Sequence, residues 1–95
     1  MAQRYRVVAS SAFERDVRRL RKHRPDVYES LVRAVEILES DPFNRKSQAN
    51  IRKLGGIPPG EGHFRLRVGD YRLRYDVAGD EVILHTFRLR SISYR

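Results

Sequence analysis

Residues 63–77, HFRLRVGDYRLRYDV, alternate between apolar and charged side chains and predict two strands joined by a tight turn. The sequence Val68-Gly69-Asp70-Tyr71 is typical of a two-residue hairpin loop, because glycine adopts a positive φ at little cost. Pairing across this turn places Val68 opposite Tyr71. The apolar side chains of both strands then share one face, which consists of Phe64, Leu66, Val68, Tyr71, Leu73, Tyr75 and Val77.

The opposite face of this hairpin carries four arginines. Arg67 faces Arg72 and Arg65 faces Arg74, so like charges lie directly opposite each other, which destabilises a sheet. A solvated basic face is the commoner explanation of such a charge run. A sheet that needed only solubility would, however, alternate the signs of charge across its strands. We therefore predict that this face binds an anion.

Composition indicates which anion to expect. The 95 residues are expected to form a single domain, 1–95, and Lys and Arg number 20 against 12 Asp and Glu, a formal net charge of +8. Such an excess makes nucleic acid the leading partner class, with an acidic protein as the alternative.

The lack of cysteine excludes disulfides and zinc–thiolate sites and fits a reducing compartment. With neither a signal peptide nor a membrane span in view, we expect a cytoplasmic protein with no membrane partner.

The segment before the hairpin predicts a strand and two helices. Residues 5–9 alternate in polarity and predict a strand. Ser11 and Glu14 have the spacing of a capping box, which predicts the start of a helix. Pro25 favours the first turn of a second helix, and residues 40–42, Ser-Asp-Pro, are expected to end it.

The remaining segments complete a small sheet. Residues 51–54 predict a short strand or a turn, residues 57–62 (IPPGEG) a loop, and residues 82–89 a last strand. The predicted fold class is therefore α+β, with an N-terminal strand, an antiparallel helical hairpin and an antiparallel β-meander that forms a small twisted sheet. The helices are expected to cover the apolar face and to leave the arginine side open.

The last strand does not follow simple alternation. Regular pairing would place His85 and Phe87 beside Arg74 and Arg72, on the charged side of the sheet. Two alternatives remain open. Either a β-bulge precedes Arg88, or the strand ends there and Arg88 emerges from the sheet edge.

Few side chains near the arginines are suited to moving protons. A phosphodiester bound over guanidinium groups is stabilised as it gains charge in the transition state, and the 2′-hydroxyl of RNA supplies an internal nucleophile. His63 falls on the arginine side by alternation, although a surface histidine at a loop end explains it equally well. Tyr94 is an acid, a base, a stacking platform for a nucleobase, or an anchor for the C-terminus. His85, inside a strand, is more typical of packing.

Several of these features together resemble the RelE/ParE superfamily of toxins from toxin-antitoxin pairs. They are the string R-x-R-x-G-D-Y-R-x-x-Y at 65–75, Asp41-Pro42, the stretch RKLGG at 52–56, and a tail containing Arg88 and Tyr94. The resemblance covers nearly the whole chain. It implies a RelE-like fold and a cognate antitoxin protein as partner. We expect neither a metal nor a small-molecule cofactor, because the sequence shows no metal-ligand cluster and no glycine-rich phosphate loop. The superfamily places ribosome-dependent endoribonucleases and gyrase-inhibiting toxins on one scaffold.

The ribonuclease branch suggests a role for each candidate. Arg72 resembles the arginine that contacts the scissile phosphate, whereas Arg65 and His63 stand where that branch often has catalytic lysines. Arg88 and Tyr94 keep the six-residue spacing of its C-terminal arginine and tyrosine. The expected catalytic residues are Arg65, Arg72, Arg88, Tyr94 and His63, and the expected RNA-binding residues are Arg67, Arg74, Arg90, Arg52 and Lys53.

These residues predict an endoribonuclease, an mRNA interferase that cleaves ribosome-bound mRNA. The expected chemistry is attack of the 2′-hydroxyl on the adjacent phosphate without a metal ion, with the ribosome and mRNA as partners. Two alternatives remain: a non-catalytic toxin of the gyrase-inhibiting, ParE-like type, and a nucleic-acid-binding domain without activity.

Overall fold

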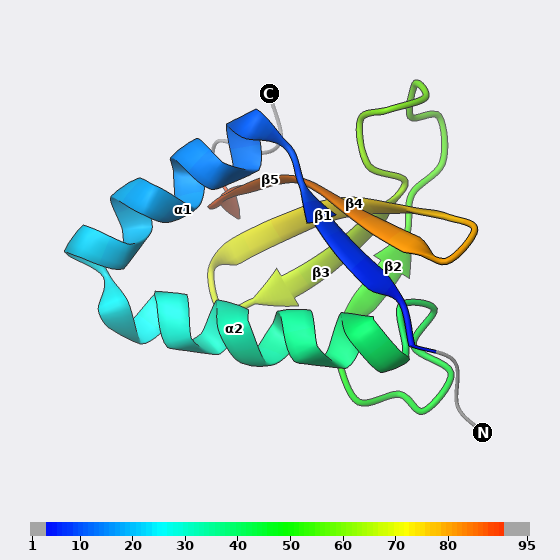
Figure 1. The fold of residues 1–95 in the computed structure, drawn as a ribbon, viewed down its shortest axis with the longest axis horizontal. Helices are drawn as coiled ribbons and strands as arrows, with labels where there is room; N and C mark the ends of the chain where they lie inside the picture. Colours follow the sequence, from blue (N-terminus) through cyan, green and yellow to red (C-terminus); the bar gives the residue numbers. More distant parts are fainter. Residues whose placement is uncertain (1–3, 91–95) are drawn as a thin grey trace.

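The computed structural model describes residues 4–90 and has an α+β architecture (Figure 1). The predicted order of strand, helical hairpin and meander is confirmed. No helix in residues 4–90 is long and apolar enough to cross a membrane. The elements are β1 (Arg6–Ala9), α1 (Ser11–His23), α2 (Pro25–Ser40), β2 (Ile51–Lys53), β3 (Phe64–Val68), β4 (Tyr71–Ala78) and β5 (Glu81–Leu89).

The five strands form one sheet in the order β1-β5-β4-β3-β2. The strands β2 to β5 pair antiparallel as a meander. The N-terminal strand β1 instead runs parallel to β5, with Val7 opposite Val82 and Ala9 opposite Leu84 (Figure 1). The sheet is therefore mixed, and the helical hairpin is part of the connection that carries the chain across it.

The central hairpin has the predicted register. Val68 pairs with Tyr71 across the turn, and Gly69 adopts a φ of 59°. Ile51–Lys53 pairs with β3, so the first of the two interpretations of this segment, a short strand, is confirmed. The alternation of apolar and charged residues therefore places the apolar side chains on one face of the sheet and the arginines on the other.

The start of α1 differs by one residue from the predicted capping box. Ser10, rather than Ser11, is the N-cap, and its hydroxyl accepts the Phe13 N–H at 3.1 Å. The same hydroxyl donates to the carbonyl of His85 at 2.8 Å, so the cap also ties α1 to β5. That contact with a distant strand explains why Ser10 occupies the capping position. The second helix has the predicted limits, beginning at its proline and ending before the Asp-Pro pair.

The hydrophobic core lies between the two helices and one face of the sheet. Tyr75 is fully buried within it and donates its hydroxyl to the Pro42 carbonyl at 2.7 Å, and burial raises the pKa of this phenol. Both helices and the apolar face of the hairpin contribute to it. The buried core residues are Phe13, Leu20, Leu31, Ala34, Leu38, Leu66, Leu73, Tyr75, Val82, Leu84 and Phe87.

A β-bulge in β5 resolves the irregular alternation of the last strand. Arg74 pairs with Thr86 and Tyr75 pairs with Leu84, so His85 is the extra residue. The first of the two alternatives, a bulge before Arg88, is confirmed, and the strand continues to Leu89.

The bulge reverses the faces of the residues that follow it. Phe87 now lies opposite Leu73 in the core and is 3% exposed, whereas Arg88 lies opposite Arg72. Phe87, which regular pairing would have placed beside the arginines, is therefore part of the core. This one-residue insertion adds a further arginine to the charged side of the sheet.

Candidate nucleic-acid interface

Six arginines align in two rows on the side of the sheet that faces away from the core. Both rows cross neighbouring strands, which lie about 4.8 Å apart in a sheet, so their guanidinium groups are held close together. The first row is Arg52, Arg65 and Arg74, and the second is Arg67, Arg72 and Arg88. We call these six residues the arginine face.

Arg72, in the middle of the second row, is not on an open surface. It is 3% exposed, so the expectation that the arginines lie open to solvent is wrong for this residue. Its Nη1 donates to the Tyr71 carbonyl at 3.3 Å, but its buried Nε has no hydrogen-bond partner among residues 4–90. A buried guanidinium with an unpaired donor is costly, and a bound anion would remove that cost.

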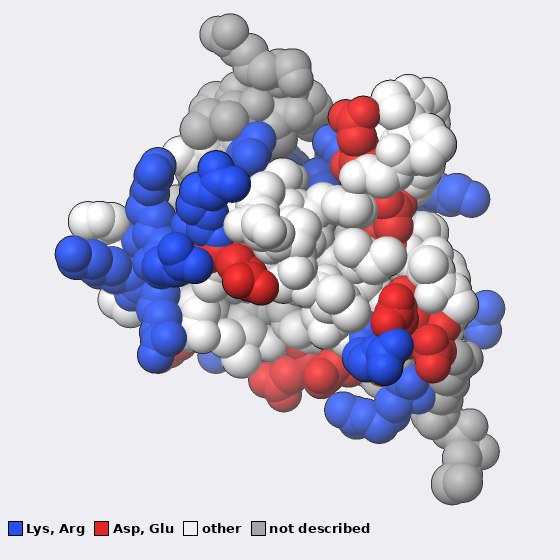
Figure 2. All heavy atoms as spheres, turned by 45° about the horizontal axis from the view of Figure 1, so that its top comes forward, with Lys and Arg blue, Asp and Glu red and all other residues white. Residues whose placement is uncertain are grey.

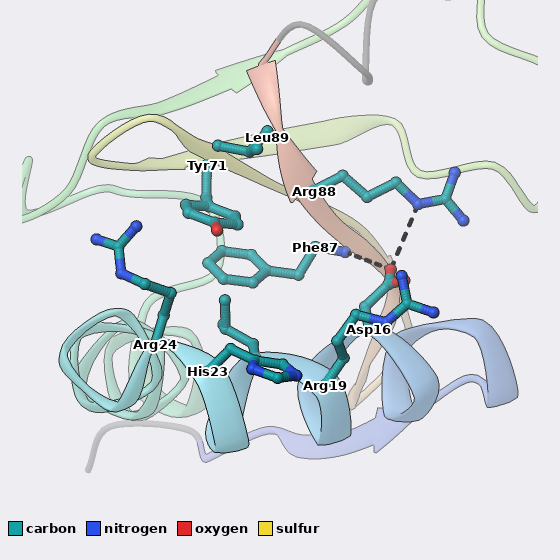
Figure 3. Close-up of a pocket in the computed structure, with 9 residues that line it drawn as sticks. Asp16, Arg19, His23, Arg24, Tyr71, Phe87, Arg88 and Leu89 are labelled. Carbon is teal, nitrogen blue, oxygen red and sulfur yellow. Dashed lines mark hydrogen bonds and ion pairs between the residues drawn. The ribbon is translucent and has the colours of Figure 1, made fainter.

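Arg88 is connected to α1 through Asp16. The Asp16 carboxylate accepts a hydrogen bond from the Phe87 N–H at 3.2 Å and one from Arg88 Nε at 3.4 Å (Figure 3). Among the described strands, β1 pairs with β5 only as far as Leu84, so Asp16 satisfies a backbone group on the unpaired edge that follows. The Arg88 side chain is 44% exposed, which leaves it accessible to a ligand.

A cavity of about 440 Å³ lies beside Arg88, between the C-terminal half of α1 and the ends of β4 and β5 (Figure 3). The rings of Tyr71 and Phe87 are stacked in its wall, with centroids 5.1 Å apart. Apolar rings next to cationic groups suit an amphipathic or aromatic anion. The lining residues are Asp16, Arg19, Leu20, His23, Arg24, Tyr71, Phe87, Arg88 and Leu89.

A second basic surface lies on α1. Figure 2 shows Lys and Arg side chains gathered at the end of the molecule that the helical hairpin forms. The exposed basic residues of α1 are Arg15, Arg18, Arg19, Arg21 and Lys22. This surface adds to the positive potential around the cavity and would attract a polyanion from a distance.

Two histidines share one carboxylate at the other end of the arginine face. His63 Nδ1 lies 2.7 Å from Asp76 Oδ1, and His85 Nε2 lies 2.8 Å from Asp76 Oδ2. The same carboxylate accepts the backbone N–H groups of Gly62 at 3.2 Å and of His63 at 2.7 Å. Partial burial raises the pKa of Asp76, but the hydrogen bonds from His63, His85 and Gly62 outweigh it and lower this pKa to about 2.

The sequence contained a signal for Asp76 that our reasoning missed. Asp76 follows Arg74 by two positions in a strand, so alternation places its carboxylate on the same side as the arginines. Asp16 had no comparable signal, because its contact with Arg88 joins a helix to a strand 72 residues away.

The other predicted site residues fall in three different places. Lys53 pairs with Phe64, so it lies on the opposite side of the sheet from the arginine face. Arg90 is exposed just beyond β5, and its N–H donates to the Asp70 carbonyl at 2.9 Å. Tyr94 lies outside the described residues, and its role stays a prediction.

The pKa of Asp76 predicts how stability depends on pH. An unfolded aspartate titrates near pH 3.9, so above about pH 5 the carboxylate is ionised in both states and its contribution to stability is complete. As the pH falls from about 5 towards 2, the unfolded state binds the proton first and about 2 kcal/mol of stability is lost. We therefore expect Asp76→Asn to lower the free energy of unfolding at pH 7 and to flatten its decline below pH 4.

Urea denaturation at pH 7, 4 and 2.5 measures this effect. Asp80→Asn is the matched control, because it makes the same charge change at an exposed position in the β4–β5 turn. Parallel stability curves for the wild type and Asp76→Asn between pH 4 and 2 would contradict the assignment.

Comparison with solved structures shows that chains of archaeal and bacterial toxin-antitoxin complexes have the same fold. A chain of the archaeal RelE–RelB complex from Pyrococcus horikoshii OT3 superposes with a TM-score of 0.72 at 23% identity, covering 93% of this chain and 97% of that one. A chain of the Escherichia coli DinJ–YafQ toxin-antitoxin complex gives a TM-score of 0.76 at 15% identity, covering 97% and 99%. At these identities the likeness establishes the fold alone. A search of curated protein sequences found no significant match.

A comparison with family models establishes the family. The model described as "ParE toxin of type II toxin-antitoxin system, parDE" matches residues 7–93. The match includes both helices, all of the sheet except Arg6, and the six arginines of the arginine face. The chain therefore belongs to the ParE toxin family of type II toxin-antitoxin systems, within the RelE/ParE superfamily.

Proposed function

We propose that this toxin is an endoribonuclease that cleaves mRNA on the ribosome. The observation that supports this most is the arginine face, with Arg72 buried at its centre and its Nε without an acceptor among the described residues. A phosphodiester supplies the missing acceptor oxygens. It also gains negative charge in the transition state, when several fixed guanidinium groups stabilise it most.

The proposed reaction needs only RNA and protein groups. The 2′-oxygen attacks the adjacent phosphorus, the bond from phosphorus to the 5′-oxygen breaks, and the products are a 2′,3′-cyclic phosphate and a 5′-hydroxyl. Arg65, Arg72 and Arg88 stabilise the phosphate charge. His63 or Tyr94 receives the proton that leaves the 2′-hydroxyl. Arg67, Arg74, Arg90 and Arg52 hold the RNA backbone.

A cognate antitoxin is the proposed protein partner. The similar chains are found in complexes named RelE–RelB and DinJ–YafQ, the second described as a toxin-antitoxin complex. A net charge of +8 favours an acidic segment, and the cavity beside Arg88 combines apolar rings with cationic groups. An acidic, amphipathic segment of the antitoxin would complement both the positive charge of this chain and the apolar rings of the cavity.

Gyrase inhibition is the second candidate, because the matching family model is that of ParE toxins. A translation extract, with mRNA mapped for cuts at the ribosome, and a gyrase supercoiling assay separate the two. We expect mRNA cleavage and unchanged supercoiling. Inhibited supercoiling with intact mRNA would establish the second candidate, and RNA binding without either effect would indicate an inactive binding domain.

Binding should weaken steeply as salt increases. Each phosphate contact releases a counterion and contributes a slope of about 0.7 in log K against log salt on a single strand. We expect Arg67→Ala and Arg74→Ala each to lower the slope by about that amount, because both arginines belong to the arginine face. The measurement is a titration of labelled RNA at several salt concentrations.

Arg33→Ala is the matched control for this titration. Arg33 is an exposed arginine on α2, so its replacement removes the same charge away from the arginine face. It should leave the slope nearly unchanged. Equal slopes for all three variants would show that the arginine face does not bind phosphates.

A further inference from the structure

The arrangement around Asp76 determines which ring nitrogen of each histidine carries its hydrogen. An ionised carboxylate is only an acceptor, so any nitrogen that bonds to it must donate. The hydrogen therefore lies on Nδ1 in His63 and on Nε2 in His85. In its neutral form each ring is therefore the opposite tautomer of the other and keeps a lone pair on the nitrogen that does not face Asp76.

The same carboxylate fixes the position of the His63 backbone. Asp76 accepts the N–H groups of Gly62 and His63, and Arg74 Nε donates to the Gly62 carbonyl at 3.0 Å. Gly62 has a φ of +88°, and a Cβ there would lie 2.9 Å from the Cβ of Arg74. Only glycine lets the chain pass this close, so His63 is held directly beside the arginine face.

The His63 and His85 side chains differ in how far they are exposed to solvent. The His63 side chain is 37% exposed, whereas that of His85 is 17% exposed. His63 is thus the ring that a substrate on the arginine face can reach. No group of three or more His, Asp or Glu side chains among residues 4–90 is arranged to hold a metal ion. The histidine–carboxylate contacts are therefore those of a hydrogen-bonded cluster.

We propose that Asp76 is a positioning residue that holds His63 with its Nε2 lone pair available, and that His63 is the general base for the 2′-hydroxyl. This inference rests on the proposed ribonuclease function and deepens it. The proton of the 2′-hydroxyl moves to His63 Nε2 as the oxygen attacks phosphorus, and the leaving 5′-oxygen takes up a proton from water. The Asp76 carboxylate compensates the charge of the imidazolium that forms. His85 keeps the second carboxylate oxygen hydrogen-bonded.

The first experiment measures the tautomers directly in the full-length toxin. Long-range ¹H–¹⁵N correlation spectra of ¹⁵N-labelled protein distinguish a hydrogen on Nδ1 from one on Nε2. We expect the Nδ1–H form for His63 and the Nε2–H form for His85, with His23 on α1 as an internal reference. The Nε2–H form at His63 would overturn the proposal whether or not the protein cleaves RNA.

The second experiment changes the carboxylate. An asparagine offers one acceptor and one donor group, so in Asp76→Asn one of the two rings must change its tautomer. We expect ribosome-dependent cleavage to fall at least 100-fold in kcat, while KM changes less than about threefold. Asp80→Asn, with the same charge change in an exposed turn, should cleave like the wild type.

Two further variants keep the test decisive if Asp76→Asn does not fold. In His85→Gln the side-chain amide still donates to Asp76, so His63 should keep its Nδ1–H form and the variant should retain more cleavage than His63→Gln. His63→Gln keeps the same kind of donor but has no basic lone pair, so cleavage should be lost. Equal cleavage by both variants, or full cleavage by folded Asp76→Asn, would overturn the inference and leave the ribonuclease function standing. A wild-type protein that cleaves no RNA would overturn both.

Discussion

Arg72→Ala should reduce mRNA cleavage by about 10²- to 10³-fold, the usual loss when one fixed donor to a developing negative charge is removed. Arg72 is buried between Arg67 and Arg88 in the register of the sheet, so its guanidinium cannot follow a phosphate that moves away. Cutting of ribosome-bound mRNA measures the effect, and growth after induction of the toxin should be restored.

The fold should survive this substitution. Alanine removes a buried cation that has like charges on both neighbouring strands, which offsets the packing lost with the side chain. We expect the free energy of unfolding, measured by thermal denaturation, to change by less than about 1 kcal/mol.

Two variants test the specificity of the Arg72 effect. Arg72→Lys keeps the charge but loses the planar, two-pronged donor, and should recover only part of the activity. Arg33→Ala removes an exposed arginine from α2 and should cleave normally. A folded Arg72→Ala protein that arrests growth as fully as the wild type would show that this residue does not act on the scissile phosphate.

A messenger with a single 2′-deoxy sugar before the scissile phosphate should not be cut at all. The substitution removes the nucleophile and leaves every phosphate in place, so binding should be nearly unchanged. Cleavage and binding are measured on the same ribosome complexes. The unmodified messenger should give a 2′,3′-cyclic phosphate and a 5′-hydroxyl, and chelation of free divalent ions should not affect the rate while the ribosomes stay intact.

The control for this substrate carries the 2′-deoxy sugar one nucleotide further downstream. It should be cut at the normal rate, because the attacking hydroxyl is still present. Efficient cutting of the first substrate would rule out 2′-hydroxyl attack. The site would then have to activate a water molecule.

Local sequence determined the central hairpin and the limits of the second helix. A glycine-containing turn and strict alternation fix the pairing of 64–68 with 71–75, since a slip of one residue would expose the apolar side chains. Pro25 and the Asp41-Pro42 pair delimit α2 for equally local reasons. Alternation also identified the four residues of the arginine face on β3 and β4, because strand period and hairpin register need only neighbouring segments. Arg52 and Arg88 were named as candidates from the family resemblance, and the sheet pairing then placed both on this face.

The position of β1 was decided by tertiary structure. Its alternation predicted a strand but not its partner, and parallel pairing with β5 joins segments that are 75 residues apart. The bulge at His85 was also decided by tertiary structure. Sequence offered two alternatives for Arg88, and the choice came from the need to bury Phe87 opposite Leu73.

In the candidate site, too, some features follow from local sequence and others depend on tertiary structure. Sequence alone indicated His63 and the arginines, because composition, turn chemistry and strand period are properties of short segments. The burial of Arg72, the contact of Asp16 with Arg88 and the sharing of Asp76 by two histidines depend on how the helices and strands pack. Such contacts join residues that are distant in the chain, and only the folded structure brings their polar atoms within hydrogen-bond distance.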